Sequence, residues 1–170
     1  MIVHTPSYLL FALAELHVQE IPGPGNNPRI ATYWKDAGLV EPDARIPGDE
    51  IPWCAAFVGA MLMRGGVQAS GSALAKSYQI WGDNASGVGL LGAIVVLNRK
   101  EPAPKWQGHV GFCVGFTPDK VHVLGGNQGD RVSIAAFPRE RIANVRYPGG
   151  WNVPQTNILL PVTQVDPSDR

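Results

Sequence analysis

One segment of the chain, residues 53–65, is almost entirely apolar and yet too short to cross a membrane. It follows Pro52 and ends at the pair Gly65-Gly66. Proline suits the first position of a helix and glycine ends one, so we predict a helix that begins at Pro52. Since this helix is apolar on nearly every side, it has to be buried on nearly every side. The remainder of the chain is therefore expected to pack around it as the central helix of a globular domain.

The first turn of this predicted helix carries Cys54. The positive end of a helix dipole favours a thiolate, which is the nucleophilic form of cysteine. Asp49, just outside the helix, is interpreted as a cap or an orienting group. The alternative interpretation is that Cys54 is a small buried apolar residue, as free cysteines commonly are. A residue elsewhere in the chain that could act as a base for the thiol would favour the first interpretation.

A histidine opens an apolar strand later in the chain. His109 begins an alternating stretch over residues 109–116, which predicts a strand with one face turned to the core. His109 lies on the other face, which is left to line a cleft or to meet the helix that carries Cys54. There the imidazole could take the thiol proton and return it to a leaving amine. The alternative is an ordinary histidine at a strand end. The predicted core face holds Val110, Phe112, Val114 and Phe116, and the other face holds His109, Gly111, Cys113 and Gly115.

A polar loop follows the next predicted strand, residues 120–124. Residues 117–120 form a turn, so the two strands are antiparallel and the end of the second returns beside His109. The loop contains Asn127 and Gln128, and either side-chain amide could accept the imidazole N–H, the third role of a catalytic triad. We favour Asn127 because it continues the alternation of the strand. The same loop is also a good turn sequence with no further role.

Taken together, these segments resemble the NlpC-type and CHAP-type (cysteine, histidine-dependent amidohydrolase/peptidase) cell-wall cysteine hydrolases. The motifs are Pro52-Trp53-Cys54-Ala55-Ala56-Phe57-Val58, Gly108-His109-Val110-Gly111-Phe112 and Leu124-Gly125-Gly126-Asn127-Gln128. The match is closest to a small branch found in phage endolysins and other bacterial lysis proteins, whose members share two further segments. These are Glu20-Ile21-Pro22-Gly23 with Asn26-Asn27-Pro28, and Ala75-Lys76-Ser77-Tyr78 with Trp81-Gly82.

The resemblance, over roughly residues 8–148, implies a papain-like α+β fold and hydrolysis of a peptidoglycan amide through a thioester. N-terminal helices would pack on an antiparallel sheet of about five strands, with Cys54 as nucleophile, His109 as base and Asn127, or Gln128, as third residue. Many CHAP proteins carry a glutamate two positions before the asparagine that Asn127 matches, and this chain has Gly125 there. The residues expected to contact substrate are Glu20, Trp53, Lys76, Trp81 and Gln107. The bond cut is either the N-acetylmuramoyl–L-alanine amide or a peptide bond, which makes the enzyme an amidase or an endopeptidase.

Composition limits the other function classes. Fourteen Lys and Arg balance fourteen Asp and Glu, so the formal net charge is zero, and no basic patch interleaved with aromatics indicates a nucleic-acid binder. Neither the cysteines nor the four histidines have the spacing of a metal site. No metal or cofactor is therefore expected. We expect a monomer, and the resemblance implies that it acts on peptidoglycan. A catalytically inert binding module and an acyltransferase of the same fold are the alternatives to a hydrolase.

The organisation expected is one domain over residues 1–148 and a tail over 149–170, which lacks clear periodicity. Residues 8–14 are apolar but no Lys or Arg precedes them, so we expect no secretory signal and no membrane span. The resemblance then implies a protein made in the cytoplasm that acts in the periplasm or cell wall after release by a holin or a secretion machine.

Overall fold

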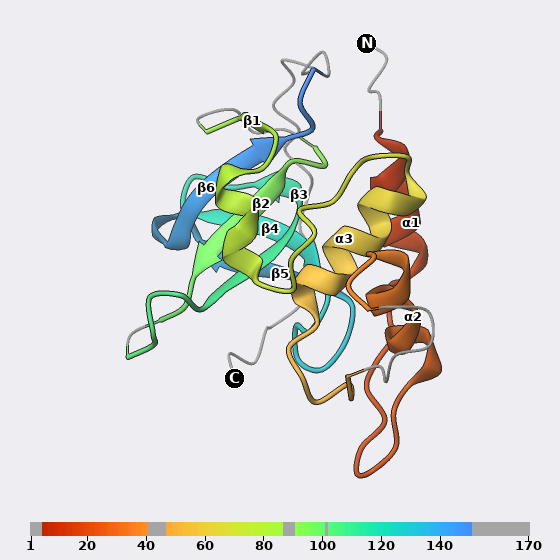
Figure 1. The fold of residues 1–170 in the computed structure, drawn as a ribbon. Helices are drawn as coiled ribbons and strands as arrows, with labels where there is room; N and C mark the ends of the chain where they lie inside the picture. Colours follow the sequence, from red (N-terminus) through yellow and green to blue (C-terminus); the bar gives the residue numbers. More distant parts are fainter. Residues whose placement is uncertain (1–4, 41–46, 87–90, 101, 151–170) are drawn as a thin grey trace.

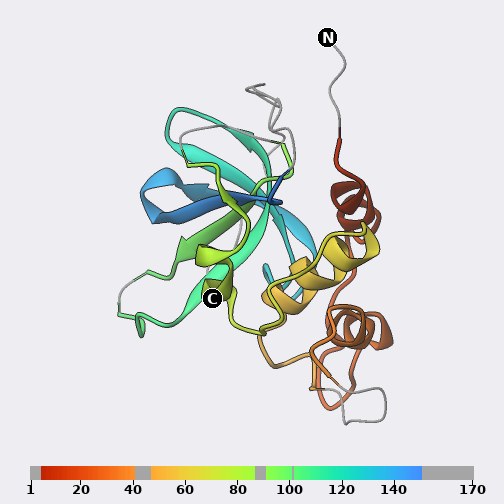
Figure 2. The ribbon, with the colours of Figure 1, turned by 45° about the horizontal axis from the view of Figure 1, so that its top comes forward.

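The computed structural model describes residues 5–40, 47–86, 91–100 and 102–150, and it has three α-helices packed on one side of an antiparallel sheet (Figures 1 and 2). This confirms the predicted α+β class with N-terminal helices on an antiparallel sheet. The helices are α1 (Ser7–Ala14), α2 (Pro28–Asp36) and α3 (Cys54–Arg64), with short 3-10 helices η1 (Ala75–Ile80) and η2 (Arg139–Arg141). The strands are β1 (Asp83–Asn84), β2 (Ile94–Asn98), β3 (Gly108–Phe116), β4 (Lys120–Gly125), β5 (Ser133–Pro138) and β6 (Ile142–Tyr147).

The sheet has the strand order β1-β6-β2-β3-β4-β5, and every neighbouring pair is antiparallel. It contains six strands rather than the expected five or so. The additional strand, β1, is two exposed polar residues that pair with β6, and such a segment has no apolar alternation to reveal it. The central strands β2, β3 and β4 are where the chain segments of the candidate site meet.

Helix α3 is buried along nearly its whole length, as its composition predicts, and only its last two residues lie outside the core. Its first residue is Cys54, and Trp53 occupies the N-cap position without a side-chain hydrogen bond. Pro52 therefore lies outside the helix, and the prediction that it takes the first helical position is wrong. The physical reason is that Trp53, with φ −113° and ψ 13°, is not helical and interrupts the run between proline and cysteine.

Apolar side chains cover both faces of the sheet, which the strand pattern alone did not reveal. Val110, Phe112 and Val114 of β3 pack with the helices in one core, as predicted. Cys113 on the opposite face belongs to a second core built from the strands themselves. The expectation that this opposite face meets the helix carrying Cys54 is therefore wrong, because that helix covers the Val110 face. Cys54 and Cys113 are both free thiols.

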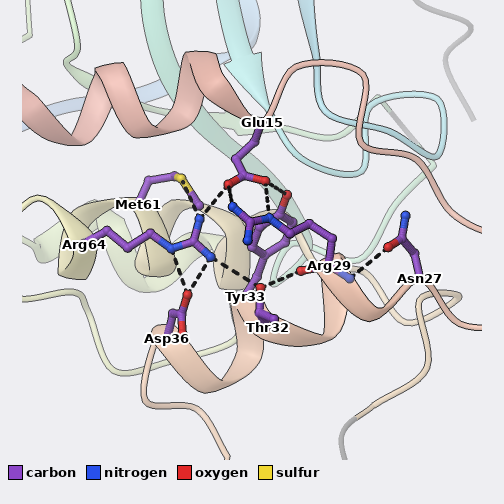
Figure 3. Close-up of polar contacts among 8 residues, drawn as sticks. All are labelled: Glu15, Asn27, Arg29, Thr32, Tyr33, Asp36, Met61 and Arg64. Atoms are coloured by element: carbon purple, nitrogen blue, oxygen red, sulfur yellow. Dashed lines mark hydrogen bonds and ion pairs between the residues drawn. The ribbon is translucent and has the colours of Figure 1, made fainter.

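A buried ionic network joins the three helices (Figure 3). The carboxylate of Glu15, which follows α1, is only 3% exposed. It accepts hydrogen bonds from Arg29 Nε and Tyr33 Oη of α2, both at 2.8 Å, and from Arg64 Nη1 of α3 at 2.7 Å. Arg64 also pairs with Asp36. Because its members come from all three helices, the network fixes α3 against the other two.

None of the helices in the described part of the chain is long and apolar enough to cross a membrane. The tail expected over 149–170 lies almost wholly outside the described residues, which end at Gly150.

Candidate active site

The thiol of Cys54 lies at the free end of α3 and is 7% exposed. Burial raises the pKa of this thiol above its ordinary value, and the opposing effects are the backbone N–H groups of Val110, Ala55 and Cys54 and the charge of Arg99. The predicted stabilisation of a thiolate by the helix end is thus present but smaller than the cost of burial. Near neutral pH the sulfur is accordingly a neutral thiol beside three backbone N–H donors.

The hydrogen bond from Val110 brings the sulfur to the start of β3, where His109 is the preceding residue. His109 is half-buried, and its ring lies 5.6 Å from the ring of Phe137 in β5. Burial lowers the pKa of His109 to about 4, with a smaller contribution in the same direction from Arg99 and Arg141 and an opposing one from Gln128. Near neutral pH the imidazole is therefore uncharged and able to accept a proton.

Gln128 is the hydrogen-bond partner of His109, with Oε1 at 2.8 Å from Nε2. The amide nitrogen of Gln128 donates to the carbonyl oxygens of Val123 at 3.2 Å and Ser133 at 2.7 Å, which leaves only its oxygen to face the ring. An acceptor on Nε2 requires that Nε2 carries the proton, so the lone pair of the neutral imidazole is on Nδ1. A buried amide thus selects the tautomer of the candidate base.

Asn127, the favoured third residue, is not the partner of His109. Strand β4 ends at Gly125, and Asn127 has φ 57°, in the left-handed region. The alternation on which its choice depended stops where the strand stops, and the reversal at Asn127 turns the next side chain towards the ring instead. Of the two residues left open by the sequence, the structure brings Gln128 to His109.

No hydrogen bond joins the thiol and the imidazole directly within the described residues, since the ring bonds to Gln128 and the sulfur to backbone groups. The sulfur lies at the N–H of Val110, and the ring of the preceding residue, His109, packs on Phe137 of the second core. Hydrogen bonds between catalytic groups often become short only in the complex with substrate. The arrangement provides a nucleophile, a base with its lone pair on the free nitrogen, and backbone N–H donors beside the sulfur.

The Gln128 contact leads to a prediction about activity. Gln128→Leu should lower kcat about 100-fold, because the tautomer and orientation of His109 lose their support. It should also move the acid limb of the pH profile to lower pH, since Gln128 raises the pKa of His109. Asn127→Gly is the matched control, because glycine keeps the positive φ, and it should stay within about threefold of the parent. Equal losses in the two variants would remove Gln128 from this role.

Glu20 and Trp53 form a contact next to Cys54. The Trp53 indole donates to Glu20 Oε1 at 2.8 Å, and Trp53 is completely buried, so the expectation that it touches substrate is not compatible with its position. Burial raises the pKa of Glu20, assisted by the charges of Asp130, Asp49 and Glu50. Asp49 does not cap α3; its carboxylate accepts from the backbone N–H groups of Ile21 and Asn27. These two acids hold the 20–27 loop against the start of α3.

The other residues expected at the substrate are Lys76, Trp81 and Gln107. Lys76 reaches Asn98 at the end of β2, with Nζ 3.0 Å from Oδ1. Trp81 follows η1, donates from its indole to the Gln68 carbonyl at 2.9 Å and packs on Tyr78. Gln107 is half-buried in the turn that leads into β3. Of these three residues, Gln107 lies two positions before His109 in the chain, and Lys76 lies against Gly108, the residue before His109.

Arg99 and Arg141 are functional candidates that the sequence analysis missed. Both act electrostatically on His109, and Arg99 acts on Cys54 as well. Single arginines after a strand or in a short turn have no motif of their own, so only the fold reveals that they meet. Among the described residues, no three His, Cys, Asp or Glu side chains gather closely enough to hold a metal ion.

Comparison with known proteins found no match to this chain among protein-family models, curated proteins or solved structures.

Proposed function

We propose that this protein is a papain-like cysteine hydrolase that cuts an amide bond of bacterial peptidoglycan. The observation that supports it most is a series of contacts. The buried thiol at the start of α3 accepts the N–H of Val110, and the preceding residue, His109, is bonded to Gln128, which selects its tautomer. A thiol, an imidazole and an amide that orients the imidazole are the three groups that amide hydrolysis by a cysteine triad uses. The substrate class comes from the resemblance to NlpC-type and CHAP-type hydrolases.

The reaction begins from a neutral thiol and a neutral imidazole. As Sγ of Cys54 attacks the amide carbonyl carbon, its proton passes to Nδ1 of His109 and a C–S bond forms. The N–H groups of Cys54 and Ala55 at the free end of α3 are the donors available to the oxyanion. The C–N bond then breaks while His109 returns the proton to the leaving amine. Water, deprotonated by the same imidazole, hydrolyses the thioester and restores the thiol.

The bond class is the part of the proposal that one experiment decides. Purified peptidoglycan is digested with the protein, and the soluble fragments are weighed by mass spectrometry. Each pair of fragments should add up to the parent muropeptide plus one water. Release of intact peptide stems identifies a muramoyl–L-alanine amidase, and shortened stems on the glycan identify an endopeptidase. Fragments cut only within the glycan strand would contradict an amide hydrolase of either kind.

The proposal also includes the site of action. The resemblance to lysis proteins supports the proposal that the protein acts on the wall after release by a holin or a secretion machine. The protein is proposed to act as a monomer.

The low pKa of His109 leads to a prediction about pH. The base works in its neutral form, and that form predominates above about pH 4. We expect kcat/KM to stay nearly constant from pH 7 to pH 5 and to fall by half near pH 4, rather than near 6.5 as for an unperturbed histidine. The measurement is the initial rate on a soluble muropeptide across pH 3.5–8. An acid limb near 6.5 would show that the imidazole is not held in this buried, neutral state.

A further inference from the structure

Three cationic residues lie around the end of β2, close to the candidate base. Lys76 of η1 donates from Nζ to Asn98 Oδ1, and Arg141 of η2 donates from Nε to the Asn98 carbonyl, both at 3.0 Å. Arg99 is the next residue in the chain and is exposed. We refer to Lys76, Arg99 and Arg141 as the basic cluster.

The sheet register places this cluster next to the site. Asn98 pairs with Gly108, and Leu97 pairs with His109. A Cβ atom at Gly108 would lie 3.1 Å from Lys76 Cγ and 3.3 Å from its Cε, so the glycine leaves room for the lysine to cross β3. The cluster therefore reaches the residue that immediately precedes the base.

Arg141 is connected to the candidate base, His109, through the ring of Phe137. Its guanidinium lies 5.2 Å from the ring centroid of Phe137, and that ring in turn packs on His109. Burial is the larger effect on both groups, and it raises the pKa of Cys54 and lowers that of His109. The charge of Arg99 makes a smaller contribution that lowers the pKa of each. Positive charge from two elements is thus directed at the reacting groups.

Two members of the basic cluster, Lys76 and Arg99, carry a charge that no carboxylate of the described residues neutralises. Neither forms an ion pair within that part of the chain, and the ammonium of Lys76 donates to the neutral amide of Asn98. An exposed guanidinium presents a planar donor fork that suits a carboxylate, and an ammonium adds a second charge beside it. An anionic group of a ligand would complete the arrangement.

We propose that the basic cluster binds a carboxylate of the peptide stem next to the amide that is cut, with Arg99 as its principal contact. The inference deepens the proposed function and depends on it, since it names the substrate feature that the site selects. It also gives the bound carboxylate an effect on the reaction. The charge of Arg99 opposes the imidazolium that forms during attack, and a carboxylate bound to Arg99 offsets that charge when substrate is present.

The test uses soluble muropeptides in which each stem carboxylate is replaced, one at a time, by a carboxamide. For one position, we expect the parent protein to cleave the carboxylate form with a kcat/KM at least tenfold above that of the amide form. Arg99→Gln should bring the two values within about twofold of each other, and Arg99→Lys should restore part of the preference. Lys120→Gln is the matched control, because Lys120 opens β4 at the opposite end of β3 from His109. It should keep the parent's preference.

Equal cleavage of every carboxylate and carboxamide pair by the parent would overturn the inference while leaving the hydrolase intact. A preference that Arg99→Gln retains in full would overturn it too. If the parent cleaves no muropeptide, the proposed function fails, and binding of the same peptides to Cys54→Ala protein decides the inference separately by calorimetry. Tighter binding of one carboxylate form, lost on adding Arg99→Gln, supports the anion site; equal or absent binding overturns it.

Discussion

Replacing Cys54 by alanine should abolish peptidoglycan hydrolysis, with a loss of at least about 10⁴-fold in rate, and leave the protein folded. The reason is chemical: the thioester cannot form without the sulfur, and loss of a nucleophile removes nearly all the rate enhancement of a triad. The fold should survive because alanine is a good helix former and the site is at the end of α3 rather than within it. The measurements are clearing of purified cell walls and thermal unfolding of the same sample.

Cys113→Ala is the matched control for this variant. Cys113 is also a buried free thiol, but it belongs to the second core on the face of β3 away from α3. Its replacement should preserve activity at a modest cost in stability. Clearing by Cys54→Ala at the parent rate would show that Cys54 is not the nucleophile. Loss of clearing in a fully folded Cys113→Ala protein would indicate that Cys113, and not Cys54, carries the reaction.

Glu15→Gln should lower the free energy of unfolding by about 3 kcal/mol at neutral pH, because it removes the shared anion from two arginines at the helix junction. Glutamine preserves the size of the side chain, so the loss reports charge rather than packing. Burial alone would raise the pKa of Glu15, but the hydrogen bonds of Arg29 and Tyr33 and the charges of Arg29 and Arg64 together lower it. The measurement is chemical denaturation of both proteins.

The direction of the pKa shift of Glu15 determines how the stability difference between the parent and Glu15→Gln depends on pH. Because the folded protein holds the pKa of Glu15 below its ordinary 4.5, the contribution is fully present above pH 4.5 and is lost as pH falls below it towards the lowered value. The gap between the parent and Glu15→Gln should therefore narrow in acid. Asp36→Asn is the control, since Asp36 pairs with Arg64 at a more exposed position and should cost about 1 kcal/mol or less. A difference in unfolding free energy between the parent and Glu15→Gln that is small at neutral pH, or that grows in acid, would contradict a stabilising role of the ionic network.

The apolar patterns of the sequence are sufficient to predict most of the elements. The run at residues 53–65 has to be buried, and it forms the central helix α3. The alternation at residues 109–116 correctly assigns Val110, Phe112 and Val114 to the core with the helices. The pattern fails on the opposite face, since small residues such as Gly111 and Cys113 look open to a cleft in the sequence. The strands cover that face with a second core instead.

The third residue of the site shows a different limit. Alternation is a rule for strands, and it ceases to apply once the backbone reverses at Asn127. The choice between Asn127 and Gln128 depends on φ at one residue, which no periodicity encodes. The sequence could narrow the candidates to two, and the hydrogen bonds of the buried amide were needed to choose between them.

Ionic contacts between distant segments could not be predicted at all. Glu15 follows α1, whereas Arg29 and Arg64 lie in α2 and α3. Lys76 and Arg141 lie in η1 and η2, and Arg99 follows β2. Each is an ordinary surface charge when the sequence is considered locally. Their convergence is a consequence of helix packing and of the β2–β3 register, which are properties of the assembled fold.

The most direct test of the central claim is the mass of the intact protein, stopped with acid during turnover of a soluble muropeptide. The account predicts a fraction of protein heavier by the acyl part of the substrate, with the added mass located on the peptide containing Cys54 and absent from Cys54→Ala. His109→Ala should not accumulate this species, because its thiol lacks a base. Turnover with no adduct on Cys54 at any quench time, or an adduct on another residue, would contradict the account.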